Sequence, residues 1–384
     1  MDDRQPSLCL NMIVKDEAHV IRRCLSSVRP LIDSWVIVDT GSNDGTQEII
    51  HQELEGIPGE LIERPWKNFS HNRNEALEYA RGKADYLLLI DADEVLQVDS
   101  TFTKATLRAD SYLGEIRTGH TSYLRHQIVR DGLPWRYVGV VHESLEYSVA
   151  TQDELLAGVY TQALPDGGRS QNPSKFRLDA LALEHALIDE PDDSRACYYL
   201  AQSYLCDGDF DNARKFYSRR IEMGGWAAEV WSARYRVACC LEHLGRPWPE
   251  VMQAFLEAFE NDPLRAEPLY RIGLHYQRND QFSLAHLFFA RAMTIPLPRH
   301  GEALFIETDV YRWLLPIEYA VSCHRIGDFS MAIEINSRLL ATADLPTPLR
   351  SMVQRNHNLS AAALEDVTQQ FSREAVCETH PAVQ

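Results

Sequence analysis

Short apolar runs and stretches with helical spacing alternate along the first 150 residues. In chain order, the pattern predicts a strand at 8–14, a helix at 19–28, a strand at 34–40, a helix at 45–54, a strand at 59–64, a helix at 70–82 and a strand at 86–94. Strands that alternate with helices favour a mostly parallel sheet with helices on both faces. Ser70 has the residue type and position of an N-cap for the third helix.

The pattern changes between residues 110 and 150, where β-rich stretches follow one another without helices. These stretches, at 115–124, 126–130 and 136–147, are expected to be mixed or antiparallel strands that extend the sheet. The residues DGLP at 131–134 have turn composition and are expected to separate two of them.

From about residue 176 the pattern is wholly helical, and it repeats. The similar segments are 196–221, 267–293 and 316–340, with a degenerate copy at 235–263. Tyr204 precedes Ala213 by the same interval that Tyr276 precedes Ala285. Small residues let paired helices approach closely, and aromatic residues fill the gaps. The segments resemble tetratricopeptide repeats, whose unit is two helices over about 34 residues.

The change of pattern predicts an α/β domain followed by an all-α domain. The predicted parts are a catalytic α/β domain at 1–150, a linker or active-site loop at 151–175, helical repeats at 176–365 and a disordered tail at 366–384. The linker is placed where the Gly-, Pro-, Ser- and Asn-rich sequence LPDGGRSQNPS lies, and the tail where periodicity ends.

Composition narrows the class of protein. The net charge of −18 over 384 residues argues against nucleic acid as a partner, because phosphate binding needs a basic face. The sequence has no apolar stretch of the roughly 20 residues that span a bilayer, and acids stand where a signal peptide would be basic. The eight cysteines show no CxxC spacing, which indicates a reduced, cytoplasmic protein. No P-loop, GxSxG or HExxH motif occurs.

The most informative stretch is YLLLIDADE at 86–94, in which a fully apolar run ends in Asp91, Asp93 and Glu94. Ligands of open α/β sheets bind at the carboxyl ends of strands. Two carboxylates one residue apart repel each other unless a cation lies between them, and Mg²⁺ and Mn²⁺ prefer oxygen ligands. The alternative is an acidic turn in solvent.

A second acid, Asp39, directly follows the apolar run of the strand at 34–40. An acid in this position has little structural reason to be there, because burying a charge is costly. At the end of a strand it can accept hydrogen bonds from a base or a ribose. The neighbouring Asp44, Gly45 and Thr46 have the chemistry of a helix start, so a structural role is expected for them.

Residues 7–150 resemble family 2 glycosyltransferases of the GT-A fold. The resemblance rests on an ordered set of stretches: NMIVKDE at 11–17, VDTGSNDGT at 38–46, SHNRNEA at 70–76, LLLIDADE at 87–94 and VGVVHE at 138–143. It implies a GT-A-like domain that binds a nucleotide-diphosphate sugar as donor and transfers the sugar with inversion at the anomeric carbon.

The resemblance also implies roles for the first two strand ends. Asp39 is expected to contact the base of the nucleotide. Lys15 and Glu17 belong to a stretch that lines the nucleotide pocket in similar proteins, partly through backbone groups. Family members often have Asn where this chain has Asp16. Capping of the following helix is an equally good explanation for Asp16 and Glu17.

Three residues are implied in metal binding. Asp93 is expected to be the direct ligand of Mn²⁺ or Mg²⁺, and Asp91 to support the ribose or the metal through water. His142 follows another apolar run, and a neutral imidazole there could complete the coordination. The alternative for His142 is a structural role at the end of a strand.

Two further residues, Arg73 and Asn74, lie on the helix that precedes the DADE strand and are candidates for donor binding. The guanidinium of Arg73 suits the geometry of a diphosphate. A surface ion pair with Glu75 or Glu78 is the alternative for this arginine.

An inverting transfer needs a carboxylate near the acceptor nucleophile. Glu143 is the candidate for this base, and Glu94 competes with it; the residues alone leave the choice open.

The sequence thus predicts a metal-dependent inverting glycosyltransferase. The helical half is expected to hold a peptide or protein acceptor or to pack against its copy in a homodimer, since repeat arrays present extended surfaces. Some peptide S- or O-glycosyltransferases combine a family 2 domain with helical repeats, and this architecture resembles theirs. The alternative from a different class is a catalytically silent scaffold whose repeats bind a partner protein.

Overall fold

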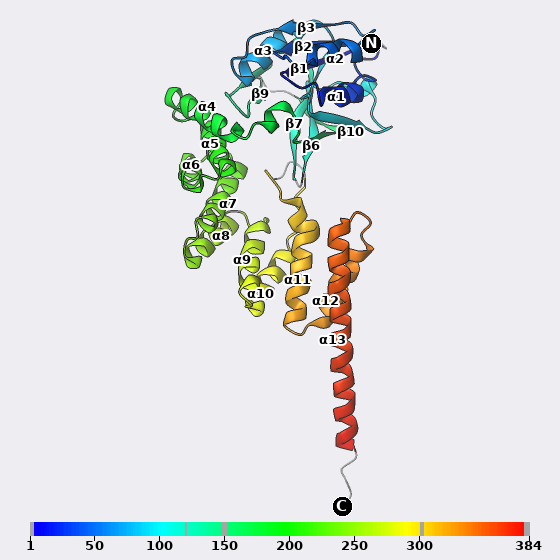
Figure 1. Ribbon diagram of the computed structural model, residues 1–384, viewed down its shortest axis with the longest axis vertical. Helices are drawn as coiled ribbons and strands as arrows, with labels where there is room; N and C mark the ends of the chain where they lie inside the picture. Colours follow the sequence, from blue (N-terminus) through cyan, green and yellow to red (C-terminus); the bar gives the residue numbers. More distant parts are fainter. Residues whose placement is uncertain (1–3, 120, 148–151, 300–302, 380–384) are drawn as a thin grey trace, which may run out of the picture. The chain divides into compact units, whose positions relative to one another are not determined.

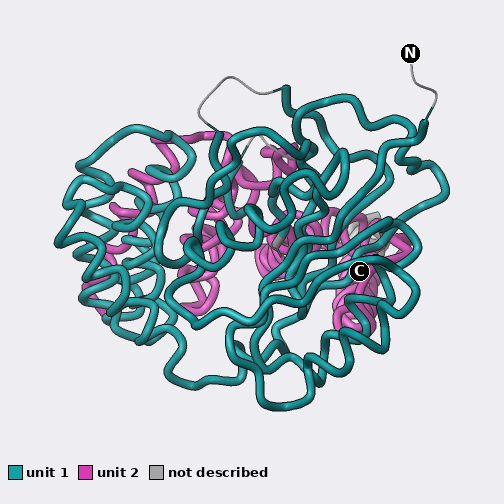
Figure 2. Tube along the Cα trace, turned by 90° about the horizontal axis from the view of Figure 1, so that it is seen from above, with its two compact units in different colours: residues 1–244, 300–305 teal, residues 245–299, 306–384 magenta. Residues whose placement is uncertain are grey.

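The computed structural model describes residues 4–119, 121–147, 152–299 and 303–379. The chain divides into two compact units, coloured separately in Figure 2: unit 1 comprises 1–244 with 300–305, and unit 2 comprises 245–299 with 306–384. The structure differs here from the boundary expected at 150–175, because the first helices of the repeat region belong to the same unit as the sheet.

Unit 1 contains an eight-stranded sheet with the spatial order β3-β2-β1-β4-β7-β6-β10-β5 (Figure 1). The strands are β1 Leu8–Val14, β2 Ser34–Asp39, β3 Gly59–Glu63, β4 Tyr86–Leu89, β5 Glu94–Val98, β6 Ser111–Thr118, β7 Thr121–Arg130 and β10 Asp153–Ala163. Strands β1 to β4 are parallel to one another. β7 is antiparallel to both β4 and β6, β10 is parallel to β6, and β5 is antiparallel to β10. This is the mostly parallel sheet that the sequence predicts.

Both faces of β1 are covered, because all seven of its residues are buried. Leu8, Leu10 and Met12 pack with residues of α1 Ile21–Val28 and α2 Thr46–Glu53. The residues between them point the other way: Cys9 and Ile13 pack with residues of α3 Phe69–Ala80. The period of two along a strand thus assigns alternate side chains to two helical layers.

Two local predictions about this region are wrong. The run predicted as one strand at 86–94 divides into β4 and β5, and the chain turns between them. The four residues of β4 are fully buried, and the chain leaves the ladder before Asp91. The N-cap of α3 is Asn68, whose side chain accepts from the His71 N–H over 2.8 Å, whereas the hydroxyl of Ser70 donates to the Gly139 carbonyl.

The strands after residue 130 also differ from expectation. The stretch predicted as a strand at 136–147 forms a hairpin of β8 Arg136–Val138 and β9 Ser144–Glu146, which is a separate two-stranded sheet. Strand β10 occupies the first part of the segment expected to be a linker at 151–175. The Gly- and Pro-rich composition that suggested a linker begins only after β10, at residue 164.

Unit 1 continues into four helices, which pack in sequence: α4 Lys175–Asp189, α5 Ser194–Asp207, α6 Phe210–Met223 and α7 Ala227–His243. Between α5 and α6 the chain reverses at Gly208, whose φ of 82° suits glycine, and Asp209 caps α6 by accepting from the Asn212 N–H. The side chains of Ala213 and Tyr217 are fully buried in this helix pair. The predicted use of small and aromatic residues in the repeats is confirmed.

Unit 2 consists of paired helices: α8 Trp248–Asn261, α9 Glu267–Arg278, α10 Phe282–Met293, α11 Leu315–Arg325, α12 Phe329–Ala341 and α13 Thr347–Thr379 (Figure 1). Ala285 and Phe289 of α10 repeat the burial of Ala213 and Tyr217. The tail expected to be disordered at 366–384 is helical as far as Thr379, and residues 380–384 lie outside the described part. No helix in the described residues is long and apolar enough to cross a membrane.

Candidate functional site

Strands β2, β1 and β4 lie side by side and are parallel, so their carboxyl ends meet at one edge of the sheet. The chain passes from β1 to β2 on one side and reaches β4 on the other side. This is a topological switch point, where open α/β sheets bind ligands. The structure therefore brings Asp39, the 15–17 segment and the turn with Asp91 and Asp93 to the same edge.

Asp39 ends β2 and is completely buried. Its Oδ1 accepts from the backbone N–H groups of Gly41 and Ser42, each over 2.7 Å, and so holds the turn after the strand. Its Oδ2 is buried and has no hydrogen-bond partner among the described residues. A buried oxygen without a partner is costly in a folded protein. A ligand's donor group would satisfy it.

The loop after β1 is tied to the loop after β2. Asp16 has a positive φ of 54°, its N–H donates to Ser42 Oγ, and its Oδ1 accepts from the Asn43 N–H. The N–H of Glu17 donates to Thr46 Oγ1 over 2.8 Å. Helix α1 has no side-chain cap, so the capping explanation for Asp16 and Glu17 is wrong.

Two other candidate residues, Asp44 and Lys15, lie in this pair of loops. The structural role of Asp44 is confirmed, because its carboxylate accepts from the N–H groups of Thr46 and Ala18. Lys15 exposes its side chain next to the two loops.

Arg73 and Arg125 link the candidate acids into one network. Arg73 donates through Nε to Glu143 Oε1 over 2.5 Å and through Nη2 to Asp91 Oδ1 over 2.6 Å. Arg125, from β7, lies 3.4 Å from Asp91 Oδ2 and donates to Glu94 Oε2 over 2.6 Å. The alternative of a surface pair between Arg73 and an acid of its own helix is therefore wrong.

The two arginines of the network determine the charge state of Asp91. Burial alone would raise the pKa of Asp91, but the charges of Arg73 and Arg125 outweigh it and lower the pKa below its usual value. Glu94 is buried, and its Oε2 also accepts from the Asp91 N–H over 2.9 Å. The structure thus turns Glu94 inward as a support of the turn, which leaves Glu143 as the more accessible of the two candidate bases.

Asp93 differs from the other acids of this turn. Its carboxylate has no hydrogen-bond or ion-pair partner from another side chain in the part of the chain that the structure describes. Burial, and then the negative charges of Asp91, Glu94 and Glu17, raise the pKa of Asp93 to about 7. The site therefore concentrates negative charge around a carboxylate that lacks a cation.

This arrangement fits a divalent cation held mainly by Asp93. No three Asp, Glu, His or Cys side chains in the described ranges converge on a point where a metal could be held by protein alone. Mg²⁺ typically binds one or two carboxylates and takes its remaining ligands from water and substrate phosphates. The donor set of Asp93, with Asp91 nearby, suits that mode. The structure does not bring His142 together with these two acids into one metal site.

His142 and Glu143 lie at the tip of the β8–β9 hairpin, residues 139–143, which we call the hairpin tip. His142 has a positive φ of 53°, and its ring stacks on Tyr199 with centroids 4.3 Å apart. Desolvation of the ring, and then the positive charges of Arg169, Arg195 and Lys175, lower the pKa of His142 to about 4. The imidazole is therefore neutral at pH 7. Asn74, a donor-binding candidate, instead holds the base of the hairpin, because its amide makes hydrogen bonds of 2.9 and 2.8 Å to the backbone of Tyr137.

A family model described as glycosyl transferase family 2 matches residues 9–112. This range runs from β1 into β6 and contains Asp39, Arg73 and the turn with Asp91 and Asp93. The chain carries a family 2 glycosyltransferase domain. The resemblance stated from the sequence motifs is thereby confirmed.

Relatives match parts of the chain. A TPR repeat-containing protein of Synechococcus elongatus is 28% identical over 238 residues, which are 57% of this chain and 57% of that protein. The SPbeta prophage-derived glycosyltransferase SunS of Bacillus subtilis is 33% identical over 91 residues, or 23% of this chain and 21% of that protein. The chain thus spans little more than half of the first relative and about a fifth of the second. A solved structure of the C-terminal part of a TPR repeat-containing protein from Cytophaga hutchinsonii is similar with a TM-score of 0.38 at 15% identity, over 51% of this chain and 70% of that one.

Several residues beyond the matched range of the family 2 domain also face its site, and the sequence motifs did not reveal them. Lys175, the first residue of α4, is half-buried and has no ion-pair partner among the described residues. Burial and the nearby Arg169 lower its pKa, whereas the charge of Asp93 opposes this effect. Arg169 packs over the Phe69 ring at 4.3 Å and pairs with the buried Asp179. These cations supply positive charge beside the acids.

The loop at 164–172 lies against the acidic turn of the family 2 domain. The Gly168 N–H donates to Glu17 Oε2 over 3.0 Å. A Cβ on Gly167 would lie 2.6 Å from Asp93 Oδ2, so any larger residue here would require the Asp93 side chain to move. Asp166 fastens the loop to α1 through Arg23. The Gly-rich segment therefore lies beside the acidic turn, and its role as an active-site loop stays a prediction.

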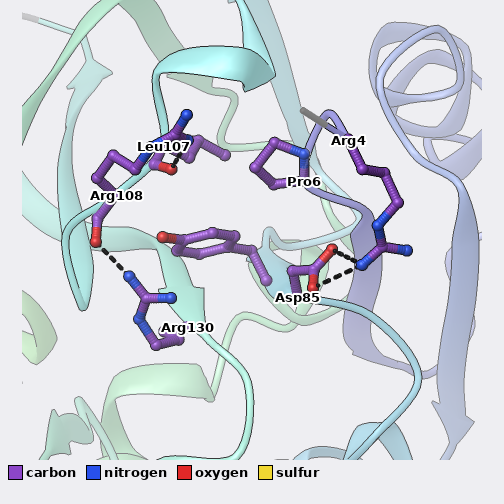
Figure 3. A pocket seen from close by; sticks show the side chains of 7 residues that line it. Arg4, Pro6, Asp85, Leu107, Arg108 and Arg130 are labelled. Carbon is purple, nitrogen blue, oxygen red and sulfur yellow. Dashed lines mark hydrogen bonds and ion pairs between the residues drawn. The ribbon is translucent and has the colours of Figure 1, made fainter. Parts of the chain in front are cut away.

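A separate cavity of about 240 Å³ lies at the amino ends of the parallel strands, away from this site (Figure 3). It is lined by Arg4, Pro6, Asp85, Tyr86, Leu107, Arg108 and Arg130. Arg4 pairs with Asp85 across it, and Arg130 donates to the Arg108 carbonyl (Figure 3). Its arginines are engaged within the protein, and none of the residues predicted for donor binding lines it.

Proposed function

We propose that this protein is an inverting glycosyltransferase that moves a sugar from a nucleotide-diphosphate sugar to an acceptor with the help of Mn²⁺ or Mg²⁺. The observation that carries the proposal is the pair of unsatisfied acidic groups at the switch point of a family 2 domain. Asp39 has a buried oxygen without a partner, and Asp93 has a carboxylate without a cation. A nucleotide and a metal-bound diphosphate would satisfy these two groups in turn.

The protein's own residues bind the donor in this scheme. Asp39 accepts from the base or the ribose through Oδ2, while its Oδ1 keeps the turn in place. The loops after β1 and β2, with Lys15 and Glu17, border the nucleotide. Asp93 holds the divalent cation, which stabilises the charge that develops on the leaving diphosphate. Lys175, whose charge interacts with that of Asp93, adds positive charge for the diphosphate.

Glu143 is the candidate base for the acceptor. It lies at the hairpin tip, and its Oε1 accepts from Arg73. Its other oxygen has no hydrogen-bond partner among the described residues and could accept a proton from the attacking group. Arg73 fixes the carboxylate at the same time as it holds Asp91, so the acceptor side and the donor side share one positioning group.

The acceptor is proposed to be a peptide or protein side chain. Helices α4 to α7 belong to the same compact unit as the catalytic sheet, so a polypeptide bound along them lies near the hairpin tip. Paired-helix arrays bind extended partners in this way. A homodimer through the helical repeats is a second use of the same region.

A silent scaffold is the other candidate, and one observation favours it. Asp91 and Glu143 are already satisfied by arginines without any ligand, as they would be in a relic. Asp39 Oδ2 and Asp93 have no such explanation, because a relic has no need for unsatisfied acids.

The test is thermal unfolding of the purified protein against a panel of nucleotides and nucleotide sugars, each with and without Mn²⁺. A ligand that binds only the folded state raises the melting temperature. The proposal expects a metal-dependent rise for one nucleotide sugar, lost in Asp93→Asn and kept in the control Asp207→Asn, whose side chain is exposed at the end of α5. A folded protein that responds to no nucleotide sugar would favour the scaffold.

A further inference from the structure

The hairpin tip is held from two sides. On the side of the family 2 domain, the Gly139 carbonyl accepts from the Ser70 hydroxyl, and Glu143 accepts from Arg73. Both donors lie on α3. The other side of the tip faces the first helices of the repeat region, which lie beyond the range matched by the family model.

Contacts with α5 hold this second side. Arg195 donates through Nε and Nη2 to the His142 carbonyl, over 3.1 and 3.0 Å. Tyr199, one turn later, stacks on the His142 ring with an interplanar angle of 12°. The guanidinium of Arg195 lies over the Tyr199 ring at 4.9 Å, as residues four apart on a helix can. The two side chains form one surface, which we call the α5 clamp.

Apolar contacts reinforce the clamp. Val140 and Val141, the residues before His142, pack against the apolar core formed by α4 to α7. His142 itself has a left-handed backbone, which is unfavourable for a residue with a side chain and persists only where the surroundings enforce it. The clamp supplies that enforcement, and the residue it holds directly precedes Glu143.

We propose that Arg195 and Tyr199 are positioning residues that set the conformation of the hairpin tip and thereby place Glu143 for the transfer reaction. The first helix pair of the repeat region is then part of the active site rather than a separate acceptor module. This inference rests on the proposed function for its catalytic consequence, whereas its structural part stands on the contacts alone.

The experiment compares Tyr199→Leu and Arg195→Ala with Tyr199→Phe. Leucine removes the aromatic stack but keeps apolar volume, and phenylalanine keeps the stack. Arg195→Ala is the second variant because Arg195 is not part of the apolar core. Two readouts are taken on the full chain: hydrogen–deuterium exchange of the hairpin 136–146, and the kinetics of sugar transfer together with donor affinity.

We expect Tyr199→Leu and Arg195→Ala to speed exchange in the hairpin about tenfold or more and to lower kcat at least about tenfold, because misplacing a reacting group is costly. Donor affinity, read from the melting shift, stays within about twofold, because neither Arg195 nor Tyr199 is among the residues proposed to bind the donor. Tyr199→Phe, which keeps the aromatic stack, should retain the wild-type rate of hairpin exchange and the wild-type kcat. A folded protein whose hairpin exchange is unchanged in both variants overturns the clamp.

The two proposals fail in different ways. If the wild-type protein binds no nucleotide sugar, the proposed function fails. Hairpin exchange in the variants still tests whether Arg195 and Tyr199 hold the hairpin tip. If the wild-type protein is active and exchange accelerates but kcat stays the same, the clamp has no part in the reaction and the positioning role is wrong.

Discussion

Arg73 and Asp91 come from different layers of unit 1, and a charge-assisted hydrogen bond of 2.6 Å joins them. Arg73 lies on α3, which covers one face of the sheet, and Asp91 lies in the turn at the end of β4. The same guanidinium reaches Glu143 at the hairpin tip. Both acids are mostly buried, so Arg73 is a counter-charge that they share, and Arg125 supplements it at Asp91.

Removal of this counter-charge is expected to destabilise unit 1. Arg73→Met should lower the free energy of unfolding by about 2–3 kcal/mol, because it removes the arginine partner of the mostly buried Glu143 and leaves Asp91 to the longer contact with Arg125. Arg81→Ala is the control: its side chain at the end of α3 is 57% exposed and pairs with the exposed Glu78, so the change should stay within about 0.5 kcal/mol. Urea unfolding of the two variants measures the difference. Equal stability of both variants would contradict the role of Arg73.

The pH dependence of stability should report on Asp93. Its pKa is raised to about 7 in the folded state, from 3.8 in the unfolded state. The folded state therefore retains a proton that the unfolded state has lost, and this stabilising contribution is present below pH 3.8 and is lost as the pH rises through 7. Asp93→Asn removes the dependence. The free energy of unfolding of the variant, minus that of the wild type, should therefore rise by about 2 kcal/mol between pH 5 and pH 8.

The measurement is urea unfolding of both proteins at the two pH values without divalent metal. Mn²⁺ added at pH 8 should reduce the difference in stability between the two proteins, because it stabilises only the wild type. A gap that does not change with pH would show that Asp93 has an ordinary pKa.

The strands and helices of the first 100 residues could be predicted because their signals are local. Each of β1, β2 and β4 is an apolar run that ends in polar residues, and parallel topology then places those ends at one edge. Strand β10 was missed because its apolar and polar residues alternate irregularly around Gly158, close to Gly- and Pro-rich sequence. The division at 86–94 depends on pairing with β10 and is equally invisible locally.

The site was only partly predictable for a related reason. The acids could be identified, because an acid after a buried run is unexpected in the sequence itself. Arg125, a partner of Asp91 and Glu94, and Tyr199, which stacks on His142, could not be identified, because both reach the site through packing between distant segments. Asn74 was assigned to the donor, yet it serves the backbone of Tyr137, 63 residues later in the chain. No spacing rule connects two such segments.

Asp39 allows binding to be separated from folding. Asp39→Asn keeps one oxygen to accept from Gly41 and Ser42, so the turn should survive. It replaces the buried oxygen without a partner by a donor amide, which cannot accept from a base or ribose. Nucleotide affinity should fall about tenfold or more, because a buried hydrogen bond is lost. Isothermal titration with the nucleotide found in the unfolding panel measures this, and unchanged affinity would remove Asp39 from the donor site.

The close approach of Gly167 to Asp93 gives a geometric prediction. The backbone of Gly167, with φ of −62°, is accessible to alanine, but the added Cβ would lie 2.6 Å from Asp93 Oδ2. Gly167→Ala should therefore push the carboxylate aside and weaken the metal-dependent melting shift. The matched test is a double-mutant cycle: Asp93→Ala should add about 1 kcal/mol more stability in the Gly167→Ala background than in the wild type, since the clash is relieved. Simple additivity of the two changes would show that the loop accommodates the methyl group elsewhere.

The pairing of β10 in the sheet predicts which fragments of the chain fold. A fragment of residues 1–150 ends where the sequence placed the domain boundary, but it lacks β10, which lies between β6 and β5. Strand β5 would lose the strand with which it pairs, and β6 would keep β7 on one side but expose its other edge; unpaired strand edges promote aggregation. A fragment of residues 1–175 retains β10 and the 164–172 loop, so its sheet is complete. Soluble expression and cooperative unfolding are therefore expected for 1–175 and not for 1–150. The longer fragment still lacks α5, so its hairpin 136–146 should exchange faster than in the full chain, and equal exchange would show that the family 2 domain positions the hairpin tip without the helices.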